Sequence, residues 1–262
     1  MKRVACVGDN CIDYYDNSGD AYPGGNPVNV AVYIHRLGGN ASYIGAVGTD
    51  RFGAFLKKTL SEKGVDISHV KTLPGKTAMT HVTMENGNRV LGEYDEGVMA
   101  EYVPDAEDVE FLCTHNLVVT GLWGHSESVL EQIHTRGIPV AFDGAERPFD
   151  RASLVALPHT DIAFFSDDFS EEKELREKVL RVAELGPGIV VATRGDQGSL
   201  AYDGKQFYLQ NAVPCEIVDT MGAGDSFIAG FLMAWIQGGS IPNCMNAGAE
   251  NAAETIGYMG GW

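Results

Sequence analysis

The fold and the chemistry of this sequence are organised around the stretch Val218-Asp219-Thr220-Met221-Gly222-Ala223-Gly224-Asp225-Ser226-Phe227. We expect a short strand at 216–218, then a glycine turn, then a helix that continues through the apolar residues up to 235. The first N–H groups of a helix lack intrahelical acceptors and lie at the positive end of the helix dipole. The stretch therefore predicts a phosphate-binding turn.

Asp225 follows these glycines directly, so it would stand beside a bound phosphate. Two negative groups side by side are unfavourable for binding alone, and accepting a proton from an attacking hydroxyl would give the acid a role. The alternative is that Asp225 only caps the helix, because aspartate is favoured at helix N-termini. The stretch by itself leaves both interpretations open.

Composition narrows the class of protein. The chain has 262 residues, 44% of them hydrophobic and 21% charged, which suits one large α/β domain. Its formal net charge of -17 argues against a nucleic-acid partner and against an anionic membrane surface, because both reward clustered lysine and arginine. An anionic ligand must then be held by local features such as a helix N-terminus, a few basic side chains or a divalent cation.

Cysteine and histidine usage indicates the compartment. The five cysteines are scattered and form no Cys-x-x-Cys pair, so we expect neither a disulfide framework nor a structural zinc site. The seven histidines show no metal-ligand spacing, and neither a signal peptide nor a membrane-spanning stretch is expected. The sequence predicts a soluble protein of the reduced cytoplasm.

Strands and helices are expected to alternate along most of the chain. Apolar runs predict strands at 4–8, 41–47, 117–120, 140–142, 162–165 and 188–193. The segments between them predict helices at 26–37, from about 53 to 63, and at 104–112, 128–136 and 170–185. Short hairpin strands at 199–202 and 206–209 precede the opening stretch, and 246–256 supplies a last helix. This alternation is typical of an α/β fold with a mainly parallel sheet.

The segment 68–102 interrupts the alternation. Predicted strands at 77–84 and 89–94 flank Asn86-Gly87, which is a strong signal for a tight hairpin turn. The hairpin is either an extension of the sheet edge or a lid that excludes water from a ligand. An acidic cluster at its end, formed by Glu93, Asp95 and Glu96, is explained either by a solvated surface or by selectivity for a cationic substrate.

The helix predicted at 26–37 begins with a second polar group, Gly24-Gly25-Asn26 followed by Asn29. The two asparagines could bind sugar hydroxyls, because an amide both donates and accepts hydrogen bonds. Equally, Asn26 could cap the helix and Asn29 could face solvent. With Gly45-x-Val47-Gly48-x-Asp50-x-x-Gly53 after it and Asp219-Thr220-x-Gly222-Ala223-Gly224-Asp225 near the end, the chain resembles the PfkB/ribokinase family of carbohydrate kinases.

The resemblance runs from end to end and implies a fold and a set of site residues. It implies one domain at 1–262, a doubly wound, mainly parallel sheet flanked by helices, with a small lid of strands near 12–22 and 68–102 that often pairs two subunits. The general base would be Asp225, with Gly222, Ala223 and Gly224 as the anion hole. The sugar site would comprise Asp13, Gly25, Asn26 and Asn29. The ATP site would comprise Thr193, Gly195, Gly198 and Asn246, and a monovalent cation such as K⁺ would lie near Asp219 and Thr220.

One departure from the family pattern concerns Mg²⁺, which ATP brings with it. Where the family carries Asn-x-x-Glu after a central strand, this sequence has Ser166-Asp167-Asp168-Phe169. Phe169 cannot replace a carboxylate. The candidates to hold a metal-bound water are Asp167, Asp168 and Glu171, and none is assigned as a direct metal ligand.

Several further segments are similar to one subgroup of the family, whose substrate is fructoselysine. They are Gly8-Asp9-Asn10-Cys11, Gly24-Gly25-Asn26, Glu96-Gly97-Val98-Met99-Ala100, Trp123-Gly124-His125 and the pair Gly261 and Trp262. The resemblance implies phosphorylation of the 6-hydroxyl of this sugar-amine, with Arg89 as a candidate for the carboxylate of its amino acid. The alternatives are a kinase for another ketose, a sugar acid or a nucleoside, and a catalytically silent sugar- or nucleotide-binding regulator.

Overall fold

Nine strands form the central sheet of the computed structural model, which describes residues 2–85 and 88–262 and, at 84–85 and 88–91, the backbone only. Their order is β13-β12-β11-β10-β9-β8-β1-β4-β5. Neighbours from β5 to β11 pair in parallel, whereas β12 and β13 pair antiparallel. The bounds are β1 Arg3–Val7, β4 Asn40–Gly48, β5 Val70–Leu73, β8 Leu117–Gly121, β9 Val140–Asp143, β10 Ile162–Ser166, β11 Ile189–Thr193, β12 Ser199–Tyr202 and β13 Phe207–Gln210.

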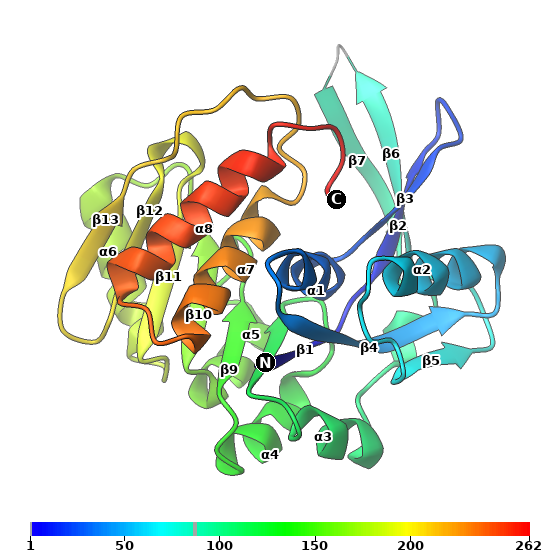
Figure 1. Ribbon diagram of the computed structural model, residues 1–262, viewed down its shortest axis with the longest axis horizontal. Helices are drawn as coiled ribbons and strands as arrows, with labels where there is room; N and C mark the ends of the chain where they lie inside the picture. Colours follow the sequence, from blue (N-terminus) through cyan, green and yellow to red (C-terminus); the bar gives the residue numbers. More distant parts are fainter. Residues whose placement is uncertain (1, 86–87) are drawn as a thin grey trace.

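Helices cover both faces of this sheet (Figure 1). Side chains alternate across a strand, so Val4 and Cys6 of β1 join one core cluster while Ala5 and Val7 join the other. The first cluster packs under α1 Asn26–Arg36, α2 Arg51–Glu62, α7 Ala223–Ile236 and α8 Ile241–Thr255. The second packs under α3 Ala106–Leu112, α4 Leu130–Thr135, α5 Arg151–Ala156 and α6 Glu172–Ala183. The predicted doubly wound, mainly parallel α/β fold is confirmed.

A second sheet of four strands projects beyond α1 and α2 (Figure 1). Its order is β3-β2-β6-β7, with bounds β2 Cys11–Tyr15, β3 Ala21–Gly24, β6 Met79–Glu85 and β7 Asn88–Asp95. Strands β6 and β7 pair antiparallel, as the hairpin signal predicts, while β2 and β6 pair in parallel. The predicted turn at Asn86-Gly87 lies outside the described residues.

Four local predictions differ from the structure. Strand β5 falls within 68–102 but pairs with β4 as the edge of the central sheet, so only part of that range belongs to the second sheet. No strand forms at 216–218, because the N–H groups of Val218 and Asp219 donate to Ile256 O at the end of α8. Helix α8 begins at Ile241 rather than at 246, after Ser240 in the N-cap position and with a proline in its first turn. Helix α5 was not expected.

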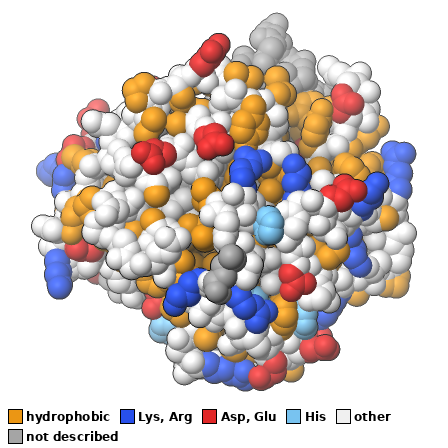
Figure 2. All heavy atoms as spheres, viewed as in Figure 1, with side chains coloured by type: hydrophobic (Ala, Val, Ile, Leu, Met, Phe, Trp, Pro, Cys, Tyr) orange, Lys and Arg blue, Asp and Glu red, His pale blue; other side chains and the backbone are white. Residues whose placement is uncertain are grey.

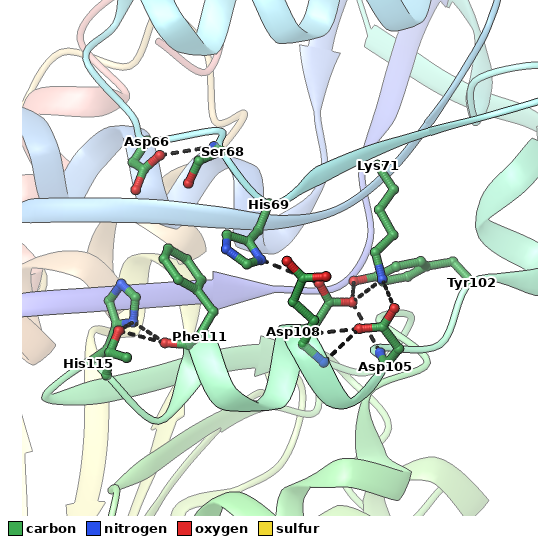
Figure 3. Close-up of polar contacts among 11 residues, drawn as sticks. Asp66, Ser68, His69, Lys71, Tyr102, Asp105, Asp108, Phe111 and His115 are labelled. Carbon is green, nitrogen blue, oxygen red and sulfur yellow. Dashed lines mark hydrogen bonds and ion pairs between the residues drawn. The ribbon is translucent and has the colours of Figure 1, made fainter.

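A buried cluster of polar contacts attaches α3 to edge strand β5 (Figure 3). Asp105 and Asp108 form a capping box at the start of α3. The buried carboxylate of Asp108 also accepts from Lys71 Nζ at 2.6 Å and from the hydroxyl of Tyr102 at 3.2 Å. A charge that is buried in this way is tolerated because it is paired and hydrogen-bonded. The cluster therefore has a structural role.

The surface carries mixed charge. On the face that bears α1, α7 and α8, acidic and basic side chains are interspersed with apolar ones (Figure 2). Among the helices described within 2–85 and 88–262, none combines the length and the apolar character that a membrane span requires.

Three short 3₁₀ helices complete the connections between the main elements, and a fourth opens the segment after β11. Their bounds are η1 Gly97–Glu101, η2 Glu127–Val129, η3 Leu157–His159 and η4 Gly195–Gln197.

Candidate active site

The glycine turn begins helix α7. Gly222 is the N-cap residue and has a φ of 74°, in the left-handed region that favours glycine. A Cβ at this position would lie 2.4 Å from the hydroxyl of Tyr33. At Gly224, by contrast, a Cβ would meet no described atom within 4 Å. Within the first turn of α7, the space beside Gly224 is therefore open, as an anion site at a helix N-terminus requires.

Asp225 lies in the first turn of α7, three residues after Gly222, which is the N-cap residue of that helix. Its Oδ1 accepts from Asn26 Nδ2 and its Oδ2 accepts from Asn29 Nδ2, both at 2.7 Å. The two asparagines come from the first turns of α1, almost 200 positions away, with sequence separations of 199 and 196. The structure therefore brings together three of the predicted site residues and disfavours the view of Asp225 as a helix cap.

The same contacts decide between the two interpretations of the asparagines. Gly25, not Asn26, is the N-cap residue of α1. Asn29 is only 8% exposed, so it does not face solvent. Both side chains instead point toward Asp225.

Two further carboxylates, which the sequence analysis did not assign to the site, complete a cluster around Asn26. Asn26 Nδ2 also donates to Asp143 Oδ2 at 2.9 Å, and the backbone N–H of Asn26 donates to Asp9 Oδ2 at 3.3 Å. Asp9 follows β1 and Asp143 ends β9. The carboxyl ends of parallel strands gather at one edge of a sheet, so an acid at the end of two predicted strands was the available signal.

Burial governs the ionisation of this cluster. Burial raises the pKa of Asp225 to about 7; the charges of Asp143 and Asp9 add to the rise, while the hydrogen bonds from Asn29 and Asn26 oppose it. Burial likewise raises the pKa of Asp143 to about 6 and that of Asp9 to about 6. A carboxylate with a pKa near neutrality is suited to exchange a proton at neutral pH.

Two buried acceptor atoms in the cluster have no hydrogen-bond partner among the described residues: Asn26 Oδ1 and Asp9 Oδ1. Buried polar atoms are normally paired, so these two acceptors are suited to receive O–H or N–H donors from water or from a ligand. Asp13 lies on β2, where its Oδ2 would be 2.9 Å from a Cβ at Gly24 of the neighbouring strand β3. The side chain of Arg89 lies outside the described part of the structure.

The predicted nucleotide residues lie at the carboxyl end of β11. Thr193 is its last residue, Gly195 begins η4, and Gly198 directly precedes β12. Asn246 lies on α8, where its Nδ2 donates to Glu250 Oε1 at 2.9 Å. The predicted residues of the nucleotide segment thus stay together, with Asn246 on a separate element.

The structure separates the acids that follow β10. The Asp167 carboxylate bonds to neighbouring residues: it accepts from Ser170 N at 2.9 Å, from Ser170 Oγ at 2.8 Å and from Lys178 Nζ. The carboxylate of Asp168 instead faces η4, with its Oδ1 3.5 Å from the position of a Cβ at Gly195. Phe169 is 98% exposed. Of the three acids considered for a metal-bound water, Asp168 therefore borders the nucleotide segment.

Asp219 links the glycine turn before α7 to the segment 260–262 by hydrogen bonds. Its Oδ1 accepts from Met221 N at 3.1 Å and its Oδ2 accepts from Gly260 N at 2.7 Å. This segment also reaches α1, where Trp262 Nε1 donates to Asn29 Oδ1 at 2.7 Å. Nothing in the sequence pattern signalled that contact.

Two residues of the acidic cluster at the end of β7 make different contacts. Asp95 Oδ1 accepts from Gly97 N at 2.9 Å and so stabilises the local turn. Glu96 Oε2 lies 3.2 Å from Nε2 of His125, in the loop after β8. His125 has a φ of 49° and its charge lowers the pKa of Asp9, against the larger effect of burial. Strained backbone of this kind is common at functional sites.

Comparison with known proteins gives consistent results. A family model described as pfkB family carbohydrate kinase matches residues 1–261. The chain is 44% identical over 262 residues to the fructoselysine 6-kinase of Shigella flexneri, covering 100% of both chains. It is 37% identical over 264 residues to the fructosamine kinase FrlD of Bacillus subtilis, covering 99% of this chain and 92% of that protein. The structure of Arabidopsis thaliana ribokinase complexed with ribose and ATP is 20% identical and superposes with a TM-score of 0.87 over 99% of this chain and 93% of that chain, so the fold is ribokinase-like.

Proposed function

The chain belongs to the pfkB family of carbohydrate kinases, and on that premise we propose that it transfers the γ-phosphoryl group of ATP to the 6-hydroxyl of fructoselysine. The acceptor is supported by the full-length identity of 44% to a fructoselysine 6-kinase. The chemistry is supported by one observation above all: the Asp225 carboxylate is held by Asn26 and Asn29, and the space beside the neighbouring Gly224 is open.

In this mechanism Asp225 is the general base. It accepts the proton of the acceptor hydroxyl while the hydroxyl oxygen forms a bond to the γ-phosphorus. The bond from that phosphorus to the β–γ bridging oxygen breaks, and ADP leaves with the electron pair. The N–H groups at 222–224 offset the charge on the phosphoryl oxygens.

ATP enters the mechanism as its magnesium complex. We propose that Thr193, Gly195 and Gly198 line the nucleotide site and that Asn246 borders the adenine of ATP. Asp168, whose carboxylate faces Gly195, is the acid best suited to hold a water of the metal, since Mg²⁺ keeps several waters and prefers oxygen ligands. A monovalent cation such as K⁺ near Asp219 stays a proposal that rests on the family resemblance.

The sugar would lie between the second sheet and the start of α1. Asp13, Gly25, Asn26 and Asn29 are proposed to line its site. The unpaired acceptors Asn26 Oδ1 and Asp9 Oδ1 are suited to receive hydroxyl or N–H donors from a sugar-amine. The four-stranded sheet is proposed to act as a lid over this site and as the surface through which two copies form a homodimer. A cytoplasmic location, where ATP is available, fits this function.

A panel of acceptors with ATP tests the proposal directly. We expect kcat/KM for fructoselysine to exceed that for fructose, a sugar acid or a nucleoside by at least about 10-fold, because selectivity arises from donors and acceptors that only the right substrate pairs. Release of ADP is the measurement. A preference for another acceptor would replace the proposed substrate, and no ADP release with any acceptor would favour a silent binding protein.

The amino-acid end of fructoselysine carries both an ammonium group and a carboxylate. We propose that Glu96 binds the ammonium and His125 the carboxylate, since the two side chains form a partly exposed pair with His125 Nε2 3.2 Å from Glu96 Oε2. Glu96→Gln is expected to lower kcat/KM for fructoselysine by roughly 10-fold, the effect of one charge-assisted hydrogen bond. The value for fructosyl-butylamine, which lacks the amino-acid group, should stay unchanged.

The matched control for this prediction is Glu93→Gln, an exposed acid on β7. Its activity on both substrates should equal that of the wild type. An equal loss on both substrates in Glu96→Gln would mean that the pair only shapes the loop.

A further inference from the structure

The segment 260–262 is docked against the catalytic turn and α1 by three hydrogen bonds. Gly260 N donates to Asp219 Oδ2 at 2.7 Å, Tyr33 Oη donates to Gly261 O, and Trp262 Nε1 donates to Asn29 Oδ1 at 2.7 Å. The indole of Trp262 is partly buried, and the ammonium of Lys63 lies 5.5 Å from the centre of its ring. The indole is therefore held in place from several sides.

The contact between Trp262 and Asn29 sets which way the Asn29 amide points. An indole N–H can only donate, so it can bond Oδ1 of the amide but not Nδ2. A carboxylate can only accept, so Asp225 can bond Nδ2 but not Oδ1. The observed arrangement satisfies both partners, with Nδ2 2.7 Å from Asp225 Oδ2. If the amide were rotated by 180°, it would lose both hydrogen bonds and would present its oxygen to the carboxylate.

We propose that Trp262 is a positioning residue for phosphoryl transfer: through Oδ1 of Asn29 it holds the amide in the orientation that donates to Asp225. Trp262 acts through Asn29 and is not itself a catalytic residue. The inference rests on the proposed role of Asp225 as the general base.

The hydrogen bond from Asn29 also affects the ionisation of Asp225. Asp225 accepts from Asn26 and Asn29 of α1 and interacts electrostatically with Tyr33 of the same helix and with the acids Asp143 and Asp9. The Asn29 bond favours the ionised carboxylate and so lowers its pKa against the larger effect of burial. Loss of a fixed Asn29 donor should raise that pKa. Because the base works only when ionised, the acid limb of the pH profile should then move to higher pH.

Trp262→Phe tests the proposal, because it keeps an aromatic ring at this position and removes the N–H donor. We expect kcat to fall by about 3- to 10-fold, the equivalent of one neutral hydrogen bond. KM for ATP should be unchanged and the acid limb of kcat should move to higher pH. Tyr258→Phe is the matched control: it removes a contact to the same segment, at Gly261 O, without touching Asn29. Its acid limb should coincide with that of the wild type.

A double-mutant cycle with Asn29→Ala isolates the pathway. If Trp262 acts through Asn29, Trp262→Phe has no further effect on kcat in the Asn29→Ala background. Equal losses in both backgrounds, or a lower kcat with an unmoved acid limb, would overturn the proposal. If Trp262→Phe fails to fold, Trp262→His is measured instead, because its ring can still donate. Its acid limb should coincide with that of the wild type, and an acid limb at higher pH would also overturn the proposal.

These measurements use whichever acceptor the wild-type enzyme phosphorylates best. If that acceptor is not fructoselysine, the substrate proposal fails while the role of Trp262 is still tested. If Asp225→Asn keeps full activity, the general-base proposal itself fails.

Discussion

Asp225→Asn is expected to lower kcat by on the order of 10²- to 10⁴-fold, because the amide cannot accept the proton of the acceptor hydroxyl. In the proposed site ATP contacts the N–H groups of the turn and the segment after β11 rather than the Asp225 side chain, so the Kd for ATP should change little. ADP release in the presence of fructoselysine measures the first quantity, and calorimetric titration with Mg-ATP measures the second. A variant with full activity would remove Asp225 from the mechanism.

The Tm of Asp225→Asn distinguishes a loss of catalysis from misfolding. The pKa of Asp225 is raised to about 7 in the folded protein, above its ordinary value of 3.8. The folded state therefore binds the proton more tightly than the unfolded state, and above the ordinary pKa the ionised group destabilises the fold. Asparagine removes that effect but can accept from only one of the two amides of Asn26 and Asn29, so the two changes oppose each other and Tm at pH 8 should stay close to that of the wild type. Asp203→Asn, at an exposed turn between β12 and β13, is the matched control and should keep full activity.

Gly222→Ala should have the second-largest effect. The new Cβ would combine a φ of 74° with an approach of 2.4 Å to the Tyr33 hydroxyl, so the turn must move. Displacing the N–H groups that are proposed to face the transferred phosphoryl group is expected to lower kcat by on the order of 10²-fold. Steady-state kinetics with Mg-ATP and fructoselysine provide the measurement.

Gly238→Ala is a close control for that variant. Gly238 has a φ of 86° just beyond the other end of α7, and a Cβ there would meet no described atom within 4 Å. It should lower the free energy of unfolding by about 1 kcal/mol through the unfavourable φ alone. Its kcat should match the wild type. Wild-type kcat in Gly222→Ala would contradict an anion site at this turn.

The sequence predicted an element correctly where the signal came from neighbouring residues. The apolar runs of the parallel strands and the turn before α7 depend on neighbouring residues, and the structure has these elements at the expected positions. The expected strand at 216–218 was wrong because strand formation needs a partner strand, and that segment bonds to the end of α8. The start of α8 was missed because Ser240 and Pro242 were not treated as a helix start.

The candidate site shows the same division. Gly222, Gly224 and Asp225 could be identified from the sequence by itself, because a glycine turn before an apolar helix determines where an anion and an acid would lie. Whether Asp225 caps its helix or meets a substrate could not be decided locally. Its two amide partners lie 199 and 196 positions away.

By itself, then, the amino-acid sequence determined the alternation of strands and helices, the glycine turn before α7 and the family resemblance. Only the tertiary structure brought Asp9 and Asp143 to Asn26, left two buried acceptors unpaired, and set Trp262 against Asn29 across 233 positions. The physical reason is that hydrophobic periodicity and turn chemistry act over a few residues. The direction of an amide and the ionisation of a buried acid depend instead on groups that meet only when the sheet is assembled.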